Sequence, residues 1–148
     1  MTIAPDTPQP PPDPPLKVVL VVRDGLPANQ AVNAATVLGA SIGARLGLPL
    51  GPEAVDATGT RYHGIVTTPV PILTTDAAEL TRLHRLAGER EQLTVLCLTE
   101  TARRARTYEA FLADLAATTE SDSDLVGMIV AGPRNQVTKL TKRLPLLA

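Results

Sequence analysis

Aromatic residues and cysteines are scarce in this chain of 148 residues. It has no tryptophan, one phenylalanine and two tyrosines, so its core must be built from aliphatic side chains. The flat aromatic side chains on which single-stranded nucleic acids stack are almost absent as well. The one cysteine, Cys97, excludes an internal disulfide and fits a reducing cytoplasm. It lies in an apolar run where a thiolate would be costly, so we interpret it as a core residue.

An excess of charge of one sign is also lacking. The 14 basic and 15 acidic residues leave a net charge of -1. A dedicated nucleic-acid binder would be clearly basic, so that class is disfavoured and weak RNA binding is kept only as an alternative. Three of the basic residues are lysines, namely Lys17, Lys139 and Lys142, and this scarcity limits any chemistry that needs an amine.

Membrane-spanning runs and metal-binding clusters are missing too. The uncharged stretch 25–44 contains Pro27, Asn29 and Asn33 and is too polar to cross a membrane. The first residues lack the basic and apolar parts of a signal peptide, so we expect a cytoplasmic protein with no membrane partner. His63 and His84 are too far apart to indicate a ligand pair, and no glycine-rich phosphate loop is present. We therefore expect no metal and no cofactor.

Proline is abundant at one end only. Residues 1–15 hold seven of the 14 prolines, which fix φ and donate no backbone hydrogen bond. This composition predicts a disordered leader, with a docking motif for a partner as the alternative. Residues 16–148 are predicted to form a single domain.

Apolar β-branched runs alternate with amphipathic segments along residues 16–148. The runs predict strands, and the segments predict helices because apolar residues recur at steps of three and four. This order indicates an α/β fold, a sheet with helices on both faces. Pro69 and Pro71 place one strand at an edge of the sheet or at a strand end. Strands are predicted at 16–22, 65–73, 93–98 and 126–131, helices at 27–46, 76–89, from Thr107 onward and 133–140, and a loop at 47–62.

Helix starts and inner faces can be assigned within these segments. Asp76 with Glu79 resembles a capping box, and Thr107 is a typical N-cap residue. The glycines Gly39 and Gly43, four residues apart, predict close packing of the first helix against the sheet or another helix. The predicted inner stripes are Val32, Ala35, Gly39, Ile42 and Leu46 in the first helix, Leu80, Leu83 and Ala87 in the second, and Tyr108, Phe111, Leu112 and Leu115 in the third.

Candidate site residues follow the predicted strands. Ligands of open α/β sheets bind beyond the carboxyl ends of strands, where helix N-termini offer free N–H groups. Asp24 and Glu100 are catalytic candidates, because they could form an acid/base pair if they converge. The alternative is a turn aspartate and a solvated glutamate. Ligand-binding candidates in the same region are Arg23, Asn29, Asn33, Thr36, Thr101 and Gly132.

Two basic clusters are candidates for phosphate binding. Arg103, Arg104 and Arg106 precede the third predicted helix, while Lys139 and Lys142 lie near the end of the chain. The two clusters could hold phosphates together if they are adjacent in space. The alternative is a solvated basic surface.

Two stretches resemble the type-2 peptidyl-tRNA hydrolases. Residues 17–26, KVVLVVRDGL, are similar to their opening strand, and residues 131–144, AGPRNQVTKLTKRL, to their closing strand, Gly-Pro turn and helix. The chain is more similar still to a small bacterial family catalogued as a domain of unknown function, number 2000. That likeness includes residues 26–33, 69–73, 106–111 and 140–147 and covers nearly all of 16–148. The resemblance implies a three-layer α/β/α sandwich around a four-stranded mixed sheet.

The resemblance implies less about activity. The lysine that the hydrolases carry at the start of their first helix corresponds to Val32, and their histidine on that helix to Gly39. Their aspartate after the third strand is matched by Glu100, and Thr138 and Thr141 fit the closing helix. Arginine or glutamine cannot replace an amine that releases a proton. We therefore expect a protein that binds an unknown small ligand or partner, with a hydrolase-like esterase with a rebuilt site and a homodimeric interaction module as alternatives.

Overall fold

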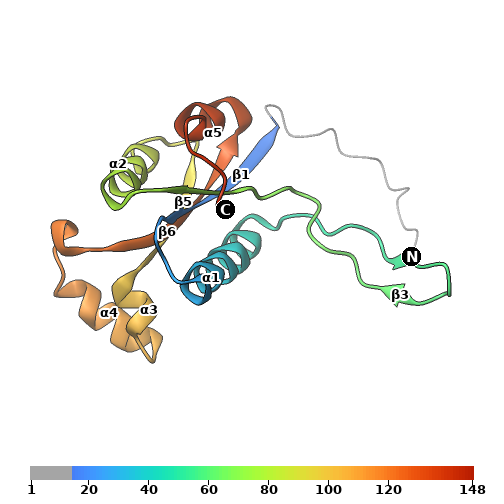
Figure 1. Cartoon of the computed structure of the whole chain (residues 1–148), viewed down its shortest axis with the longest axis horizontal. Helices are drawn as coiled ribbons and strands as arrows, with labels where there is room; N and C mark the ends of the chain where they lie inside the picture. The colour runs from blue at the N-terminus through green and yellow to red at the C-terminus, as the bar shows by residue number, and fades with distance from the viewer. Residues whose placement is uncertain (1–14) are drawn as a thin grey trace, which may run out of the picture.

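The computed structural model describes residues 15–148, so the leader predicted at 1–15 lies almost wholly outside the described residues. A four-stranded mixed sheet forms the centre of the molecule, with strand order β4-β1-β6-β5 (Figure 1). β1 runs parallel to β4 and antiparallel to β6, and β5 runs antiparallel to β6. The strands are β1 (Leu16–Arg23), β4 (Ile72–Thr75), β5 (Thr94–Thr99) and β6 (Leu125–Pro133).

The central strand pair, β1 with β6, is buried on both faces. Val18 to Val22 are each at most 1% exposed, and the ladder runs from Leu16 opposite Pro133 to Val22 opposite Gly127. A strand that is apolar at every position needs cover on both sides of its sheet. Helices provide that cover, so the predicted α/β class and the four-stranded mixed sheet are confirmed.

Each face of the sheet has its own apolar cluster. Val18, Leu20 and Val22 pack against α1, while Val19 and Val21 pack on the opposite side against α2 and α5. Figure 1 shows α1 separated from α2 and α5 by the sheet. The helices that make these layers, with the short ones that follow β5, are α1 (Ala28–Leu46), α2 (Ala77–Gly88), α3 (Glu100–Arg104), α4 (Tyr108–Ala116), the 3-10 turn η1 (Glu120–Asp122) and α5 (Arg134–Thr141).

The predicted inner stripe of α1 is wrong at Val32 and confirmed at Ile42. Val32 is 64% exposed, whereas the helix buries Ala31, Ala34, Leu38 and Ile42, and Ala35 and Leu46 are partly buried against the same cluster. Small alanines let the helix approach the sheet closely. The prediction chose Val32 for the inner face because its side chain is the more apolar one. The expected close contact at Gly39 and Gly43 is also absent, because a Cβ built at either would meet no atom within 4 Å.

Helix caps are predicted better than helix faces. The Asp76 carboxylate accepts a hydrogen bond from the Glu79 N–H, and Leu80, Leu83 and Ala87 form the buried stripe of α2, as expected. The Thr107 hydroxyl caps α4 by accepting from the Ala110 N–H. The apolar stripe predicted for α4 is not buried, however, since Tyr108 is 74% and Leu112 53% exposed.

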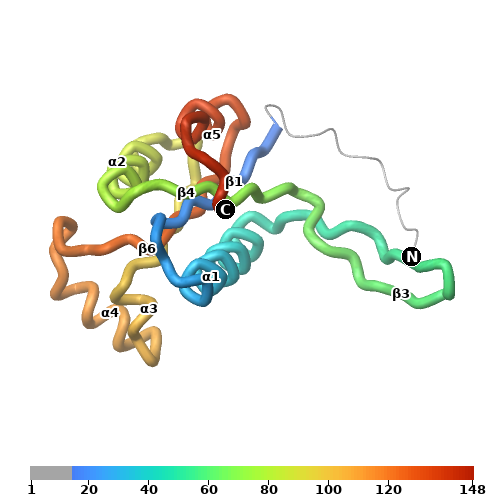
Figure 2. The backbone as a smooth tube through the Cα atoms, viewed as in Figure 1, coloured from blue at the N-terminus to red at the C-terminus, as the bar shows by residue number. Residues whose placement is uncertain are grey.

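Residues 48–71 form a projecting arm in place of the predicted loop and the first part of the predicted edge strand. Short strands β2 (Ala54–Val55) and β3 (Arg61–Tyr62) pair antiparallel within it, and Leu50 bridges to Val66. The arm extends away from the layered body (Figure 2). Pairing with β1 therefore starts only at Ile72, although β4 does lie at an edge as the prolines predicted.

The two edges of the sheet differ. The C-terminal segment covers β4, with the Thr74 N–H donating to the Pro145 carbonyl and the Leu147 N–H to the Ile72 carbonyl. Among residues 15–148, β5 pairs with β6 alone, so the other side of β5 is an open edge in this part of the chain. Within residues 15–148, no helix is long and apolar enough to span a bilayer.

Two glycine substitutions should have opposite effects on stability. Gly39→Ala should raise the free energy of unfolding by about 0.5–1 kcal/mol, because alanine is the better helix former and nothing obstructs its Cβ. Gly132→Ala should lower it by about 1–3 kcal/mol, because the Cβ would lie 2.6 Å from Leu93 Cδ2 and 2.8 Å from the Gln92 carbonyl oxygen. Chemical denaturation of both variants beside the parent chain tests this. Equal effects of the two substitutions would contradict the packing described.

Candidate functional site

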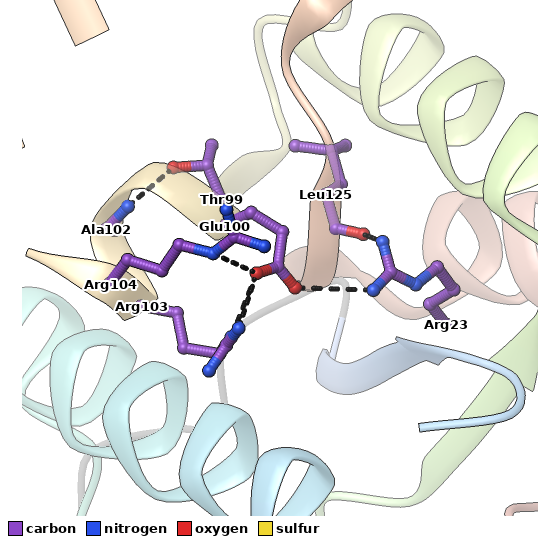
Figure 3. A network of polar contacts seen from close by, with 7 residues as sticks. All are labelled: Arg23, Thr99, Glu100, Ala102, Arg103, Arg104 and Leu125. Carbon is purple, nitrogen blue, oxygen red and sulfur yellow. Dashed lines mark hydrogen bonds and ion pairs between the residues drawn. The ribbon is translucent and has the colours of Figure 1, made fainter. Parts of the chain in front are cut away.

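The Glu100 carboxylate is the centre of a polar network where β1 and β5 end and β6 begins (Figure 3). Its Oε1 accepts from Arg23 Nη2 at 3.3 Å. Its Oε2 accepts from Arg103 Nε and Nη2 at 3.0 and 2.8 Å and lies 3.4 Å from Arg104 Nε. The side chain is 14% exposed. One carboxylate thus neutralises part of the charge of three arginines.

Local structure explains how these groups meet. The Thr99 hydroxyl caps the short helix α3 by accepting from the Ala102 N–H. Within a helix, residues three and four positions apart share a face, so Arg103 and Arg104 both face Glu100. Arg23 approaches from the end of β1 and also donates from Nη1 to the Leu125 carbonyl at 3.3 Å. The network therefore fastens α3 to the two central strands.

The acid/base pair considered for Asp24 and Glu100 is not formed. The hydrogen bond from Arg103 lowers the pKa of Glu100, and the charges of Arg103, Arg23 and Arg104 add to this effect against the opposing effect of desolvation. Asp24 is exposed, and no hydrogen bond or ion pair joins it to Glu100 within residues 15–148. Glu100 is thus a bound carboxylate, poorly suited to accept a proton near neutral pH.

A groove of about 1020 Å³ lies beside the open edge of β5. Its floor is formed by β5, and its sides come from α1, from the segment joining α3 to α4, and from His84 of α2. Three arginines line it, and no aspartate or glutamate does. The lining includes Asn33, Ser41, Arg45, His84, Val95, Cys97, Arg103, Arg106, Tyr108 and Phe111.

Burial shifts the pKa values of two groove residues, His84 and Cys97, toward their neutral forms. Burial lowers the pKa of His84, although the negative charge of Glu120 opposes this. Burial raises the pKa of the Cys97 thiol, which agrees with its interpretation as a packing residue rather than a nucleophile. In the part of the chain that the structure describes, no three His, Cys, Asp or Glu side chains gather to hold a metal ion.

The ligand-binding candidates are divided among several places. Asn33 lines the groove, whereas Asn29 and Thr36 are exposed on α1 and the Thr36 hydroxyl donates to the Val32 carbonyl. Thr101 faces a separate hollow of about 490 Å³ that also contains Asp114, Asp122 and Asp124. Gly132 is buried against Gln92 and Leu93, where its lack of a side chain serves packing.

The two basic clusters do not form one phosphate site. Arg103 and Arg104 are engaged by Glu100, and Arg106 lines the groove. Lys139 belongs to α5, with Lys142 just beyond its end, and α5 packs on the face of the sheet opposite to α1. Sequence reasoning missed Ser41, Arg45, His84 and Phe111 as groove residues. These residues come from α1, α2 and α4, which meet beside β5 only in the folded chain.

Replacing Glu100 should change acid stability in a defined direction. Glu100→Gln should lower the free energy of unfolding at neutral pH by about 1–3 kcal/mol, through loss of charge-assisted hydrogen bonds. Because folding lowers the pKa of Glu100, its stabilisation is present above the unfolded pKa and is lost as pH falls through the folded pKa. The difference between parent and variant should therefore shrink as pH falls from 7 to about 3.

Denaturation curves of both proteins over that pH range measure the difference. Glu109→Gln is the matched control, because Glu109 is exposed on α4 and makes no ion pair within the described residues. A difference between parent and Glu100→Gln that stays constant with pH would show that the network does not depend on the carboxylate charge.

Comparison with known proteins gives a family but no activity. The family model described as "Protein of unknown function (DUF2000)" matches residues 16–148. Among solved structures, the protein of unknown function Atu0240 from Agrobacterium tumefaciens strain C58 is similar with a TM-score of 0.80 and 26% identity, covering 90% of this chain and 98% of that one. No curated protein matches. Because the family model matches nearly all of the described residues, the chain belongs to the DUF2000 family.

Proposed function

We propose that this protein is a binding protein, and that its ligand is an extended, negatively charged polypeptide segment held in the groove beside β5. The observation that carries the proposal is the combination of an open strand edge with a groove lined by Arg45, Arg103 and Arg106 and by no carboxylate. Backbone groups along the unpaired side of β5 are free to bind an added strand.

The groove supplies each kind of interaction that such a ligand needs. Main-chain hydrogen bonds along β5 would provide affinity without regard to side chains. Val95, Cys97 and Phe111 offer apolar contact for alternate ligand side chains. Arg45 and Arg106 make no ion pair within residues 15–148, so they remain available to carboxylates of the ligand.

The architecture supports a finer proposal about ancestry. We infer that the fold is that of the type-2 peptidyl-tRNA hydrolases, on the basis of the mixed four-stranded sheet and the closing β6, Gly-Pro turn and α5. The hydrolase reaction itself finds little support. No lysine lies between Lys17 and Lys139, the Lys17 ammonium donates to the Thr138 hydroxyl at 3.0 Å, and Glu100 is engaged by arginines.

A charged peptide probe tests the binding proposal. A fluorescent peptide of alternating valine and glutamate should bind the full chain, and Arg106→Glu should weaken binding at least about tenfold through like-charge repulsion. Arg143→Glu is the matched control and should leave affinity within about twofold, because Arg143 is exposed and does not line the groove. Fluorescence anisotropy measures all three. Equal binding of a valine and lysine peptide, or equal loss in both variants, would contradict a cationic groove.

A direct assay tests the loss of hydrolase activity. The purified protein should not hydrolyse an N-blocked aminoacyl-tRNA, measured beside an authentic type-2 peptidyl-tRNA hydrolase as the positive control. The physical reason is that the lysine of the hydrolases has no counterpart between Lys17 and Lys139, and that the Glu100 carboxylate is engaged by arginines. Turnover that disappears in Glu100→Ala would overturn the binding-protein proposal in favour of a rebuilt esterase site.

A further inference from the structure

The open edge of β5 presents the backbone groups of alternate residues. The Leu20 N–H donates to the Pro71 carbonyl, so even-numbered residues of β1 face β4 and odd-numbered residues face β6. The directly opposed pairs of β1 with β6 and of β6 with β5 carry this alternation across the sheet and turn the even-numbered residues of β5 toward β6. The N–H groups of Val95, Cys97 and Thr99 therefore point to the open side.

The leader contains a segment whose length and proline spacing match this edge. Residues 2–7, TIAPDT, are as many as the six residues of β5 and include one proline, at position 5. A strand bonds its neighbour through alternate residues, and a proline fits at an edge where its nitrogen faces away. With position 5 facing away, the residues that face β5 are Thr2, Ala4 and Asp6, and each has an N–H to donate. The even positions that follow, 8, 10, 12 and 14, are all prolines, so pairing stops there.

Charge also favours the leader as an occupant of the groove. Its first 14 residues contain two acidic side chains, Asp6 and Asp13, and no basic one. Among residues 15–148, the groove is lined by three arginines and His84 and by no aspartate or glutamate. The leader therefore has the chemistry of the negatively charged segment that we propose as the ligand.

The leader is long enough to reach the groove of its own chain. The Pro15 carbonyl accepts from the Arg134 N–H beside the start of β1, and the two ladders place Thr94, the first residue of β5, level with Val18. A strand added beside β5 would lie three strand spacings from β1, or about 14 Å away. Residues 8–14 would span about 22 Å as a polyproline helix, which covers this distance.

We propose that residues 2–7 of the leader bind along β5 of the same chain as a fifth, antiparallel strand, and that an acidic ligand must displace them. The tether gives the leader an effective concentration in the millimolar range, so modest contacts suffice to hold it. The leader thus lowers the apparent affinity of the groove for its ligand. This inference rests on the proposed function of the groove and adds its regulation.

The point of arrival determines the direction and the register of the added strand. Because residues 8–14 arrive at the start of β5, position 7 lies there and the segment runs antiparallel to β5. All three donors of the leader meet the open edge when Ala4 lies opposite Cys97. Ile3 then lies opposite Leu98 on the face that α1 covers, where Val37 lines the groove and is 41% exposed. The leader would bury this apolar surface.

The same register brings Asp6 to the end of the groove where positive charge is available. Asp6 lies opposite Val95, near the start of β5. Arg45 belongs to the last turn of α1, which follows the end of β1 and runs back across the sheet, so this turn lies toward the start of β1 and of β5 (Figure 1). Arg45 lines the groove and makes no ion pair within residues 15–148.

Proline substitutions in the full chain test the pairing. Ala4→Pro removes the central donor of the leader, so the peptide of alternating valine and glutamate should bind this variant at least about fivefold more tightly than the parent. Thr7→Pro is the matched control, because the N–H of position 7 faces away from β5, and its affinity should stay within about twofold of the parent. Fluorescence anisotropy measures all three. Equal gains in both variants, or no gain in Ala4→Pro, would contradict the pairing.

A disulfide tests the register without any ligand. Residues of a hydrogen-bonded antiparallel pair have Cα atoms about 5.5 Å apart, which suits a disulfide. Under mild oxidation, Ala4→Cys should therefore form an intrachain bond to the native Cys97, identified by peptide mapping. Thr7→Cys is the control and should not, because position 7 lies opposite Thr94 on the other face. Equal bonding by both variants, or bonds only between two chains, would overturn docking of the leader in its own groove.

The two experiments together separate this inference from the proposed function. If Ala4→Cys forms no bond and Ala4→Pro leaves probe affinity unchanged, while Arg106→Glu still weakens the probe, the leader inference is wrong and the groove function stands. If the bond forms but neither the parent nor Ala4→Pro binds the probe, the proposed function falls, and the regulatory role of the leader falls with it. If neither the bond nor probe binding is found, both are wrong.

Discussion

Burial of two adjacent strands on both faces, with aliphatic side chains alone, is the constraint on which the molecule depends. β1 and β6 are apolar at nearly every position, so neither face of the sheet can meet water. Without tryptophan and with a single phenylalanine, the chain cannot fill wide gaps between layers. Helices must come close, and α1 does so through Ala31 and Ala34, which have almost no side chain to hold it away.

The same arrangement determines where binding can occur. A four-stranded sheet with its two most apolar strands at the centre leaves β4 and β5 at the edges. The C-terminal segment covers β4 with backbone hydrogen bonds, while β5 ends in the charged helix α3 and stays open. An open edge is normally a liability for a protein, because it can pair with any extended chain. In the function that we propose, the arginines along the groove select the charge of the segment that pairs with β5.

Local patterns predicted the local structure, and tertiary contacts decided the rest. The caps at Asp76 and Thr107 and the stripe of α2 depend on residues within a few positions of one another, and these predictions are confirmed. The inner face of α1 was misassigned at Val32 because Val32 and Ala31 both fit a helical period, and only the packing of the helix on the sheet shows which of them is buried. The arm was taken for a loop because Pro49, Pro52 and several glycines interrupt its strands, while its pairing depends on residues up to 16 positions apart. For the site, Glu100 was predicted to be a catalytic candidate, but its three arginine partners leave it no freedom to act as a base.

The placement of Glu100 has a consequence for the electrostatic potential of the whole surface. Three guanidinium groups surround one carboxylate, and Arg106 lies close by along the chain. Loss of that single negative charge leaves a concentrated positive field at the end of the groove, of the kind that attracts polyanions regardless of their sequence. The chain as a whole is nearly neutral, so we expect removal of this one charge to raise the affinity of the arginine-lined groove for RNA of any sequence.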